Sequence, residues 1–306
     1  MFQAEDPRNG AGRPVMATIG VSDIEAATTA YCKLLGYQCV DEEPISEAYA
    51  SVWDDDAVTA RPSRVLKPES GAPVFIRLVE ADQEIENAPP PKFGWFALEI
   101  CVQDSAALYE TLCAHDYFEP FAPPRVLAFT DMVFPFQCRG RNGEVLYLNE
   151  TRGNLPELDL PLAGSFVDHI FIVVLGALRI DDSADFYMDV LQNKLQESHE
   201  LAYRTINRVF DLPLETLHKL KTFGSGRNVC LEIDQFPVQA KARGPESGIT
   251  QGICCVSFGA EIGGEHTRST VSVPDAPYNG RQVSHVFGPD GERIELIVID
   301  APWANR

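Results

Sequence analysis

Three ionisable side chains, His169, Glu232 and Glu295, stand in apolar, strand-like stretches of a chain of 306 residues. A charge in such a stretch is costly unless it is paired with an opposite charge or bound to a metal ion. Imidazole and carboxylate groups are common ligands of divalent metals, and both can also move protons. The structural alternative is a hydrogen-bonded core histidine and a salt bridge between each glutamate and an arginine. The elements that position the three residues help to decide between these interpretations.

The sequence repeats one pattern four times, and a repeat of this kind determines how the whole fold is interpreted. In the first unit, an alternating apolar run reaches Val21, and Asp23 then caps an amphipathic stretch that ends at Gly36. Strand-like segments follow. The later units begin, in order, near Trp95, Phe166 and Gln251. Each unit is therefore predicted to contain a strand, a helix and two or three further strands.

The four units are expected to form two domains of two adjacent units each. The first domain spans residues 1–150, the segment 151–165 is rich in glycine and proline and serves as a linker, and the second domain spans 166–306. The fourth unit is degenerate, because Gly263 and Gly264 fall where its helix should be. Its helix is therefore predicted to be short or missing.

Composition restricts the classes of partner. The net charge is −20 and the pI is about 4.6, which argues against binding to nucleic acids or to anionic membrane surfaces. The sequence has no run of 18 apolar residues and no N-terminal signal peptide pattern, so we expect a cytoplasmic protein. Eight cysteines without a CxxC pair are interpreted as reduced thiols, mostly buried.

The repeated motifs resemble those of the vicinal oxygen chelate superfamily, which includes glyoxalase I, resistance proteins and extradiol dioxygenases. The resemblance is carried by Val21-Ser22-Asp23 before the first helix, by Phe186-Tyr187 in the third helix, and by the turn and strand at 288–296. It covers nearly the whole chain. It implies an α+β fold of two domains, each with paired βαβββ modules whose curled mixed sheets surround a cleft.

In that superfamily, metal ligands come from the first and last strands of each module, because alternate strand residues point to one face. At these positions the N-terminal pair of units has Met16, Arg77, Ala97 and Tyr147, which predicts no metal there. The C-terminal pair has His169, Glu232, Gln251 and Glu295. The resemblance implies that this second set binds a divalent ion such as Zn²⁺, Ni²⁺, Mn²⁺ or Fe²⁺.

Two alternatives stay open for the fourth unit. A different register would place Cys255 rather than Gln251 at the ligand position, and His285, on the strand before Glu295, is the best substitute ligand. Residues proposed to bind substrate are Tyr203, Arg204, Asn207 and His285. Arg204 could hold a carboxylate or phosphate, or could be an ordinary surface charge.

The favoured function is a metal-dependent, glyoxalase-like lyase or isomerase that acts on a small oxygenated substrate, with Glu232 or Glu295 as the group that moves the proton. One alternative is a ring-cleaving dioxygenase that uses His169, His285 and Glu295. The other is a metal-free protein that binds or sequesters a small molecule. The faces of the first half could also form a homodimer interface.

Overall fold

The computed structural model of the protein describes residues 11–82, 92–127, 130–153, 155, 158–240, 248–261, 265–267 and 269–299. The first unit comprises β1 (Pro14–Val21), α1 (Ile24–Leu34), β2 (Gln38–Asp41), α2 (Glu47–Trp53), the 3-10 helix η1 (Asp56–Val58), β3 (Ser63–Lys67) and β4 (Phe75–Glu80). The second comprises β5 (Gly94–Val102), α3 (Ser105–Cys113), β6 (Phe118–Pro120), β7 (Val133–Gly140) and β8 (Val145–Thr151).

The two later units follow the same order of elements. The third comprises β9 (Val167–Ala177), α4 (Ile180–Leu191), β10 (Lys194–Ala202), α5 (Arg204–Val209), β11 (Leu217–Ser225) and β12 (Asn228–Gln235). The fourth comprises β13 (Gly252–Ala260), the 3-10 helix η2 (Glu265–Thr267), β14 (Val271–Val273), β15 (Arg281–Phe287) and β16 (Arg293–Val298). Between β13 and β14 the described residues contain only η2, as the Gly263-Gly264 pair predicted, although those two glycines lie outside the described residues.

The strands form two curled eight-stranded sheets, and the predicted α+β fold of paired βαβββ modules is confirmed. The first sheet has the order β14-β15-β16-β13-β1-β4-β3-β2, and the second has the order β10-β11-β12-β9-β5-β8-β7-β6. The first unit therefore pairs with the fourth through β1 and β13, and the second pairs with the third through β5 and β9. The expectation that the first unit pairs with the second and the third with the fourth, with a boundary at the segment 151–165, is wrong.

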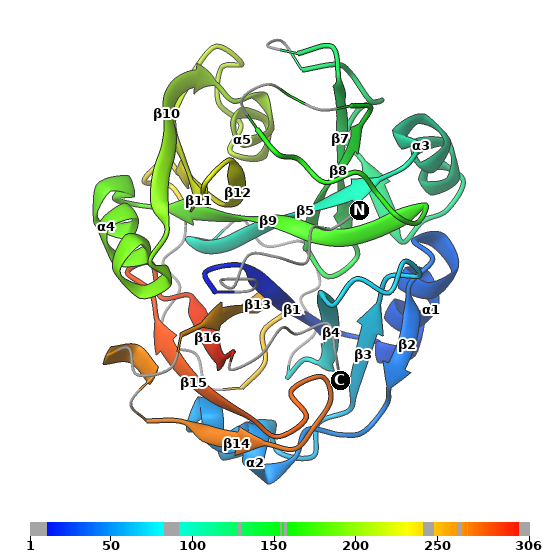
Figure 1. Ribbon diagram of the computed structural model, residues 1–306. Helices are drawn as coiled ribbons and strands as arrows, with labels where there is room; N and C mark the ends of the chain where they lie inside the picture. The colour runs from blue at the N-terminus through cyan, green and yellow to red at the C-terminus, as the bar shows by residue number, and fades with distance from the viewer. Residues whose placement is uncertain are drawn as a thin grey trace.

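The two sheets lie back to back, with α4 at one side and α1 and α3 at the other (Figure 1). Between them is a shared core to which both sheets contribute alternate residues, such as Ile19 and Phe258 from the first sheet and Leu98 and Val173 from the second. The period of two along each strand sends the intervening residues to the opposite face. We call these faces, which turn away from the shared core, the first and second outer faces.

Two equivalent hydrogen bonds between a tyrosine and a glutamate join the sheets across this core. Tyr31, on α1 of the first sheet, donates to Glu144, which precedes β8 of the second sheet, at 3.2 Å. Tyr187, on α4 of the second sheet, donates to Glu292, which precedes β16 of the first sheet, at 2.7 Å. Both glutamates are buried, and burial raises the pKa of each carboxyl to about 7. The repeated hairpin turn therefore fastens each sheet to a helix of the other.

The same two turns also support the helices that they touch. The side chain of Asn142 accepts a hydrogen bond from the backbone N–H of Ser22, just before α1, at 2.9 Å. Asp290 accepts one from the N–H of Leu178, just before α4, at 2.8 Å. This second contact matters because Arg179, the N-cap of α4, makes no capping hydrogen bond with its side chain. Asp290 thus supplies a partner for unpaired N–H groups near the helix start.

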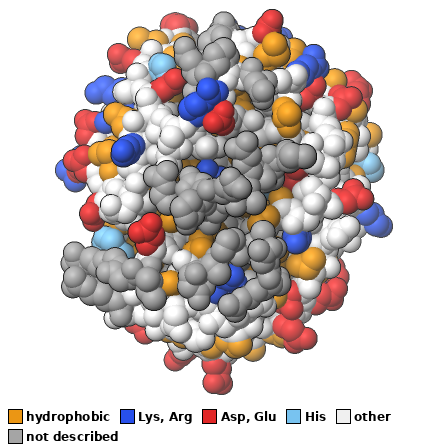
Figure 2. All heavy atoms as spheres, in the orientation of Figure 1, with side chains coloured by type: hydrophobic (Ala, Val, Ile, Leu, Met, Phe, Trp, Pro, Cys, Tyr) orange, Lys and Arg blue, Asp and Glu red, His pale blue; other side chains and the backbone are white. Residues whose placement is uncertain are grey.

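The surface carries charges of both signs. Around the outline of the face in Figure 2, acidic side chains are interspersed with Lys and Arg side chains. In the described part of the chain, no helix is both long enough and apolar enough to cross a membrane.

The two buried carboxyls predict a pH-dependent stability. Each has a folded-state pKa of about 7, above the usual 4.5, so the folded state binds the proton more tightly than the unfolded state. Their stabilisation is complete below about pH 4.5 and is lost as the pH rises through 7, by roughly 3 kcal/mol for each group. We expect the double variant Glu144→Gln/Glu292→Gln to lose less stability than the wild type between pH 5 and pH 8 in urea unfolding.

The matched control is Glu110→Gln, which changes an exposed carboxyl on α3 and should keep the pH dependence of the wild type. Equal pH dependence in the wild type and the double variant would show that the two tyrosine–glutamate contacts do not couple folding to protonation.

Candidate functional site

Three carboxylates gather on the second outer face, at the junction of the second and third units. Glu99 lies on β5, and Glu232 and Asp234 lie on β12; we call these three residues the acidic cluster. Asn149, on β8, donates to Glu99 at 2.5 Å, and the hydroxyl of Tyr203 donates to Glu232 at 3.3 Å. Glu99 and Glu232 are half-buried, whereas Asp234 has no exposed surface.

The strand pattern explains why these residues meet. Leu231 and Ile233, the neighbours of Glu232, belong to the shared core, so Glu232 and Asp234 must face outward. Leu98 and Ile100 flank Glu99 in the same way. The sheet order β12-β9-β5-β8 places these strands side by side, with only β9 between β12 and β5.

Aromatic side chains surround the cluster. Phe96 and Phe236 contact each other edge to face with ring centroids 4.9 Å apart, and Phe210 contacts Phe236 at 5.1 Å. These rings belong to the apolar cluster of the second outer face, which also contains Tyr147. The carboxylates are therefore set in a mostly apolar wall, where their charges interact strongly.

The acidic cluster is not neutralised by any described cation. Burial, followed by the charge of Glu232, raises the pKa of both Glu99 and Asp234 well above the usual values. Burial raises the pKa of Glu232 to about 7. In the described ranges, neither carboxylate oxygen of Asp234 has a hydrogen-bond partner. A fully buried carboxylate without partners is costly, so the cluster either holds protons or binds a positive group.

The donors of the cluster fit a hard divalent cation. They are carboxylate, amide and phenol oxygens, the type of ligand that suits Mg²⁺ or Mn²⁺, and the orphaned oxygens of Asp234 supply the charge that such an ion needs. No imidazole of the described residues takes part in the cluster. The donor set therefore does not favour Zn²⁺, Ni²⁺ or Fe²⁺, which were predicted together with Mn²⁺ on the basis of His169.

The first outer face has a different arrangement, in which a buried carboxylate is fully satisfied. Glu295, on β16, accepts hydrogen bonds from the Trp53 indole at 2.6 Å, the Ser257 hydroxyl at 2.5 Å and the Tyr278 hydroxyl at 2.7 Å. Its exposed fraction is 0%. Trp53 reaches it from α2, which lies against this face together with Tyr49.

Arg77 places a positive charge among the aromatic side chains of this face. Its guanidinium lies 4.3 Å from the ring centroid of Tyr49 and 5.1 Å from that of Tyr278, and it donates to the carbonyl of Ala276 at 2.6 Å. The side chain is buried, and its positive charge interacts with Glu295. The first outer face therefore does not fit a metal ion.

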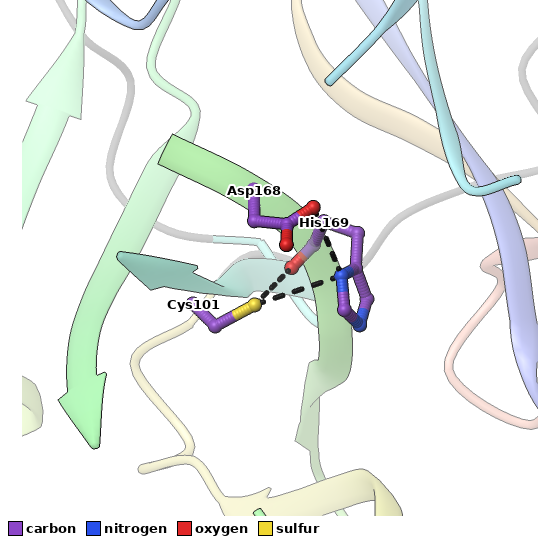
Figure 3. A group of neighbouring side chains, drawn as sticks. All are labelled: Cys101, Asp168 and His169. Carbon is purple, nitrogen blue, oxygen red and sulfur yellow. Dashed lines mark hydrogen bonds and ion pairs between the residues drawn. The ribbon is translucent and has the colours of Figure 1, made fainter. Parts of the chain in front are cut away.

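The four predicted ligands do not form one site. Glu232 lies on the second outer face and Glu295 on the first, with the shared core between them. Glu232 pairs with Val174 of β9. His169 is five residues before Val174, so it lies about 16 Å along β9 from the position beside Glu232. It instead lies beside Cys101 and Asp168 (Figure 3). The prediction of a single four-ligand site in the C-terminal half of the chain needs correction. The third unit belongs to the second sheet and the fourth unit to the first, so the two units do not share one face.

Gln251 is also remote from Glu295. The residue of β13 that pairs with Glu295 is Ser257, six residues and about 20 Å further along the chain. Cys255, the alternative ligand, pairs with Arg293 instead. Neither register therefore gives the predicted ligand set.

The candidate substrate-binding residues are divided in the same way. Tyr203 contacts the acidic cluster through Glu232, and Arg204 is exposed at the start of α5. Asn207 is buried and supports the chain after α5, because its side chain donates to the carbonyls of Leu214 and Thr216 at 3.1 and 2.9 Å. His285 pairs with Glu295 in the first sheet, whereas Tyr203 contacts Glu232 of the second sheet.

The sequence contained a signal for the residues that were missed. Glu99 stands between apolar strand residues, as Glu232 and Glu295 do, but the resemblance places the ligand position two residues earlier, at Ala97. Asn149 lies two residues after Tyr147 on the same strand. The second unit thus contributes Glu99 and Asn149 to the acidic cluster, although the sequence predicted no metal ligand in the N-terminal half.

Comparisons with known proteins support the fold alone. No protein-family model matches the chain, and no curated protein matches it. Among solved structures, glyoxalase I from Zea mays has 13% identity and a TM-score of 0.60, with coverage of 94% of this chain and 92% of that one. A putative dioxygenase from Bacillus subtilis has 13% identity and a TM-score of 0.61, with coverage of 97% and 88%.

The contacts of Glu295 predict a structural role. Glu295→Gln should lower the free energy of unfolding by roughly 3 kcal/mol, because an amide offers one acceptor oxygen to three buried donors. Chemical denaturation measures this loss, with Glu69→Gln in the exposed β3–β4 loop as the control. A variant of unchanged stability would contradict the structural role, and a selective loss of activity would restore the catalytic role predicted from the sequence.

Proposed function

The chain has the vicinal oxygen chelate fold, and on that premise we propose that it is a metal-dependent lyase or isomerase that acts on a small oxygenated molecule at the second outer face. The observation that carries the proposal is the acidic cluster without a described counter-charge, and Asp234 in particular. One buried and two half-buried carboxylates this close together weaken the fold unless they serve a ligand or a reaction.

Glu99, Asp234 and Asn149 would hold the cation, and Glu232 would move the proton. A bound divalent ion would supply Lewis-acid polarisation of substrate oxygens. Glu232 suits proton transfer because it is half-buried and its pKa of about 7 lets it accept and release a proton near neutral pH. Tyr203 donates to one oxygen of Glu232 and so orients the other toward a substrate.

The aromatic wall would bind the apolar part of the substrate and exclude water. Phe236 packs against both Phe96 and Phe210, so this wall is preformed. A dry surrounding strengthens the interaction of Glu232 with a proton on carbon next to a carbonyl group. Small α-hydroxycarbonyl compounds, which offer vicinal oxygens, are the class of substrate that fits.

The dioxygenase alternative finds less support. Its three ligands would be His169, His285 and Glu295, but His169 belongs to the second sheet and the other two to the first. A facial triad needs two imidazoles and one carboxylate on one ion. A metal-free binding protein is the outcome that remains if no cation binds.

Cation binding tests the ligand assignment. Chelator-treated wild type should bind one Mn²⁺ per chain in calorimetry, and Asp234→Asn should weaken binding at least about tenfold because it removes a charged ligand. Glu200→Gln, an exposed change on β10 of the same sheet, should bind as the wild type does. Absence of stoichiometric Mn²⁺ or Mg²⁺ binding by the wild type would reject the metal-dependent mechanism.

Isotope exchange tests the proton-transfer assignment. The Mn²⁺-loaded protein in D₂O should exchange the carbon-bound proton of an α-hydroxycarbonyl substrate, as followed by NMR. Glu232→Gln should slow the exchange by about 100-fold or more and keep Mn²⁺ binding, since general base catalysis contributes about that much. If the variant exchanges as fast as the wild type, Glu232 is not the base.

A further inference from the structure

A second group of metal-ligand side chains lies apart from the acidic cluster, at the other end of the β5–β9 pair. Cys101 is near the end of β5, and Asp168 and His169 are near the start of β9 (Figure 3). The two strands pair there through Val102 and Val167, with register shifts that turn the three side chains toward one another. Their exposed fractions are 1%, 2% and 6%.

The two distances that His169 makes within this group are close to the edges of a tetrahedral zinc site. The sulfur of Cys101 lies 3.6 Å from Nδ1 of His169, and the same nitrogen lies 3.2 Å from Oδ1 of Asp168. All three ligand atoms lie within 4.8 Å of one another. Zinc bonds of about 2.3 Å to sulfur and about 2.0–2.1 Å to nitrogen and oxygen give tetrahedral edges of about 3.6 and 3.4 Å.

Neighbouring groups fix the carboxylate in position. Oδ2 of Asp168 accepts from the N–H of Gly164 at 2.5 Å, and Oδ1, which faces His169, accepts from the Ser70 hydroxyl at 2.5 Å. The carbonyl of Asp168 accepts from the Tyr37 hydroxyl at 2.7 Å. Hydrogen bonds of this kind orient metal ligands and strengthen binding.

We propose that Cys101, Asp168 and His169 bind a Zn²⁺ ion that fastens the two sheets together. Zinc binding displaces the proton of the thiol, so a thiolate, a carboxylate and a neutral imidazole balance the charge of the ion in this buried place. The fourth position of the tetrahedron takes a water molecule. Sulfur and nitrogen donors select zinc here, whereas the oxygen donors of the acidic cluster select a harder ion.

The site has a structural consequence, because its supporting residues come from both sheets. Ser70 lies in the loop between β3 and β4, and Tyr37 lies between α1 and β2, so both belong to the first sheet. Cys101, Asp168 and His169 belong to the second. A zinc ion that holds Asp168 in place therefore also holds these contacts, and its binding should raise the melting temperature.

Cobalt substitution tests the proposal with a readout other than activity. One equivalent of Co²⁺ should give a near-ultraviolet thiolate-to-cobalt band and the visible bands of a tetrahedral site. Cys101→Ser should abolish the thiolate band. Cys113→Ser, which changes an exposed cysteine on α3, and Asp234→Asn, which changes the acidic cluster, should both keep it.

The outcomes separate this site from the proposed active site. A thiolate band that is absent in the wild type, or that persists in Cys101→Ser, overturns the zinc site whether or not Mn²⁺ binds the acidic cluster. If Cys101→Ser does not fold, X-ray absorption of the zinc-loaded wild type decides. One sulfur ligand supports the site, and a shell of nitrogen and oxygen alone overturns it.

Discussion

The pairing of the first unit with the fourth and of the second unit with the third, through their first strands, is the constraint on which the rest of the structure depends. Because β1 pairs with β13 and β5 pairs with β9, each sheet is continuous across two units that are distant in sequence or joined only by the segment 151–165. The chain must complete its last unit before the first sheet can form. The two sheets then share one apolar core, so neither half of the sequence folds as an independent domain with a core of its own.

The reciprocal hairpin turns convert this topology into a fixed orientation of the sheets. Glu144 and Glu292 follow the same turn motif, and each accepts a hydrogen bond from a tyrosine of the opposite sheet. Gly140 and Gly288 precede them because a β-carbon at either position would collide with the glutamate side chain. The turn that precedes the last strand of the second and fourth units thus also positions each sheet against a helix of the other.

The sequence allowed the units and their helix caps to be predicted, because these depend on local patterns. Asp23 accepts the capping hydrogen bond that its position suggested. The pairing of units is not local, since each unit carries the same signals and nothing in them states which partner it takes. The third unit adds a further difficulty. In the first unit, Met16 lies seven residues before the helix N-cap Asp23. In the third unit, the residue seven before the N-cap Arg179 is Ile172 and not His169.

The two outer faces show how duplicated units can diverge in charge while keeping one fold. On the first face, Glu295 has three hydrogen-bond donors and a buried arginine nearby, so its charge is satisfied by the protein itself. On the second face, Asp234 is equally buried but has no donor in the described part of the chain, and two further carboxylates lie close to it. Burial alone does not distinguish a functional carboxylate from a structural one. The distinction lies in whether the protein supplies the partners or leaves them to be supplied by a ligand, and on this criterion we propose the second face as the place of the chemistry.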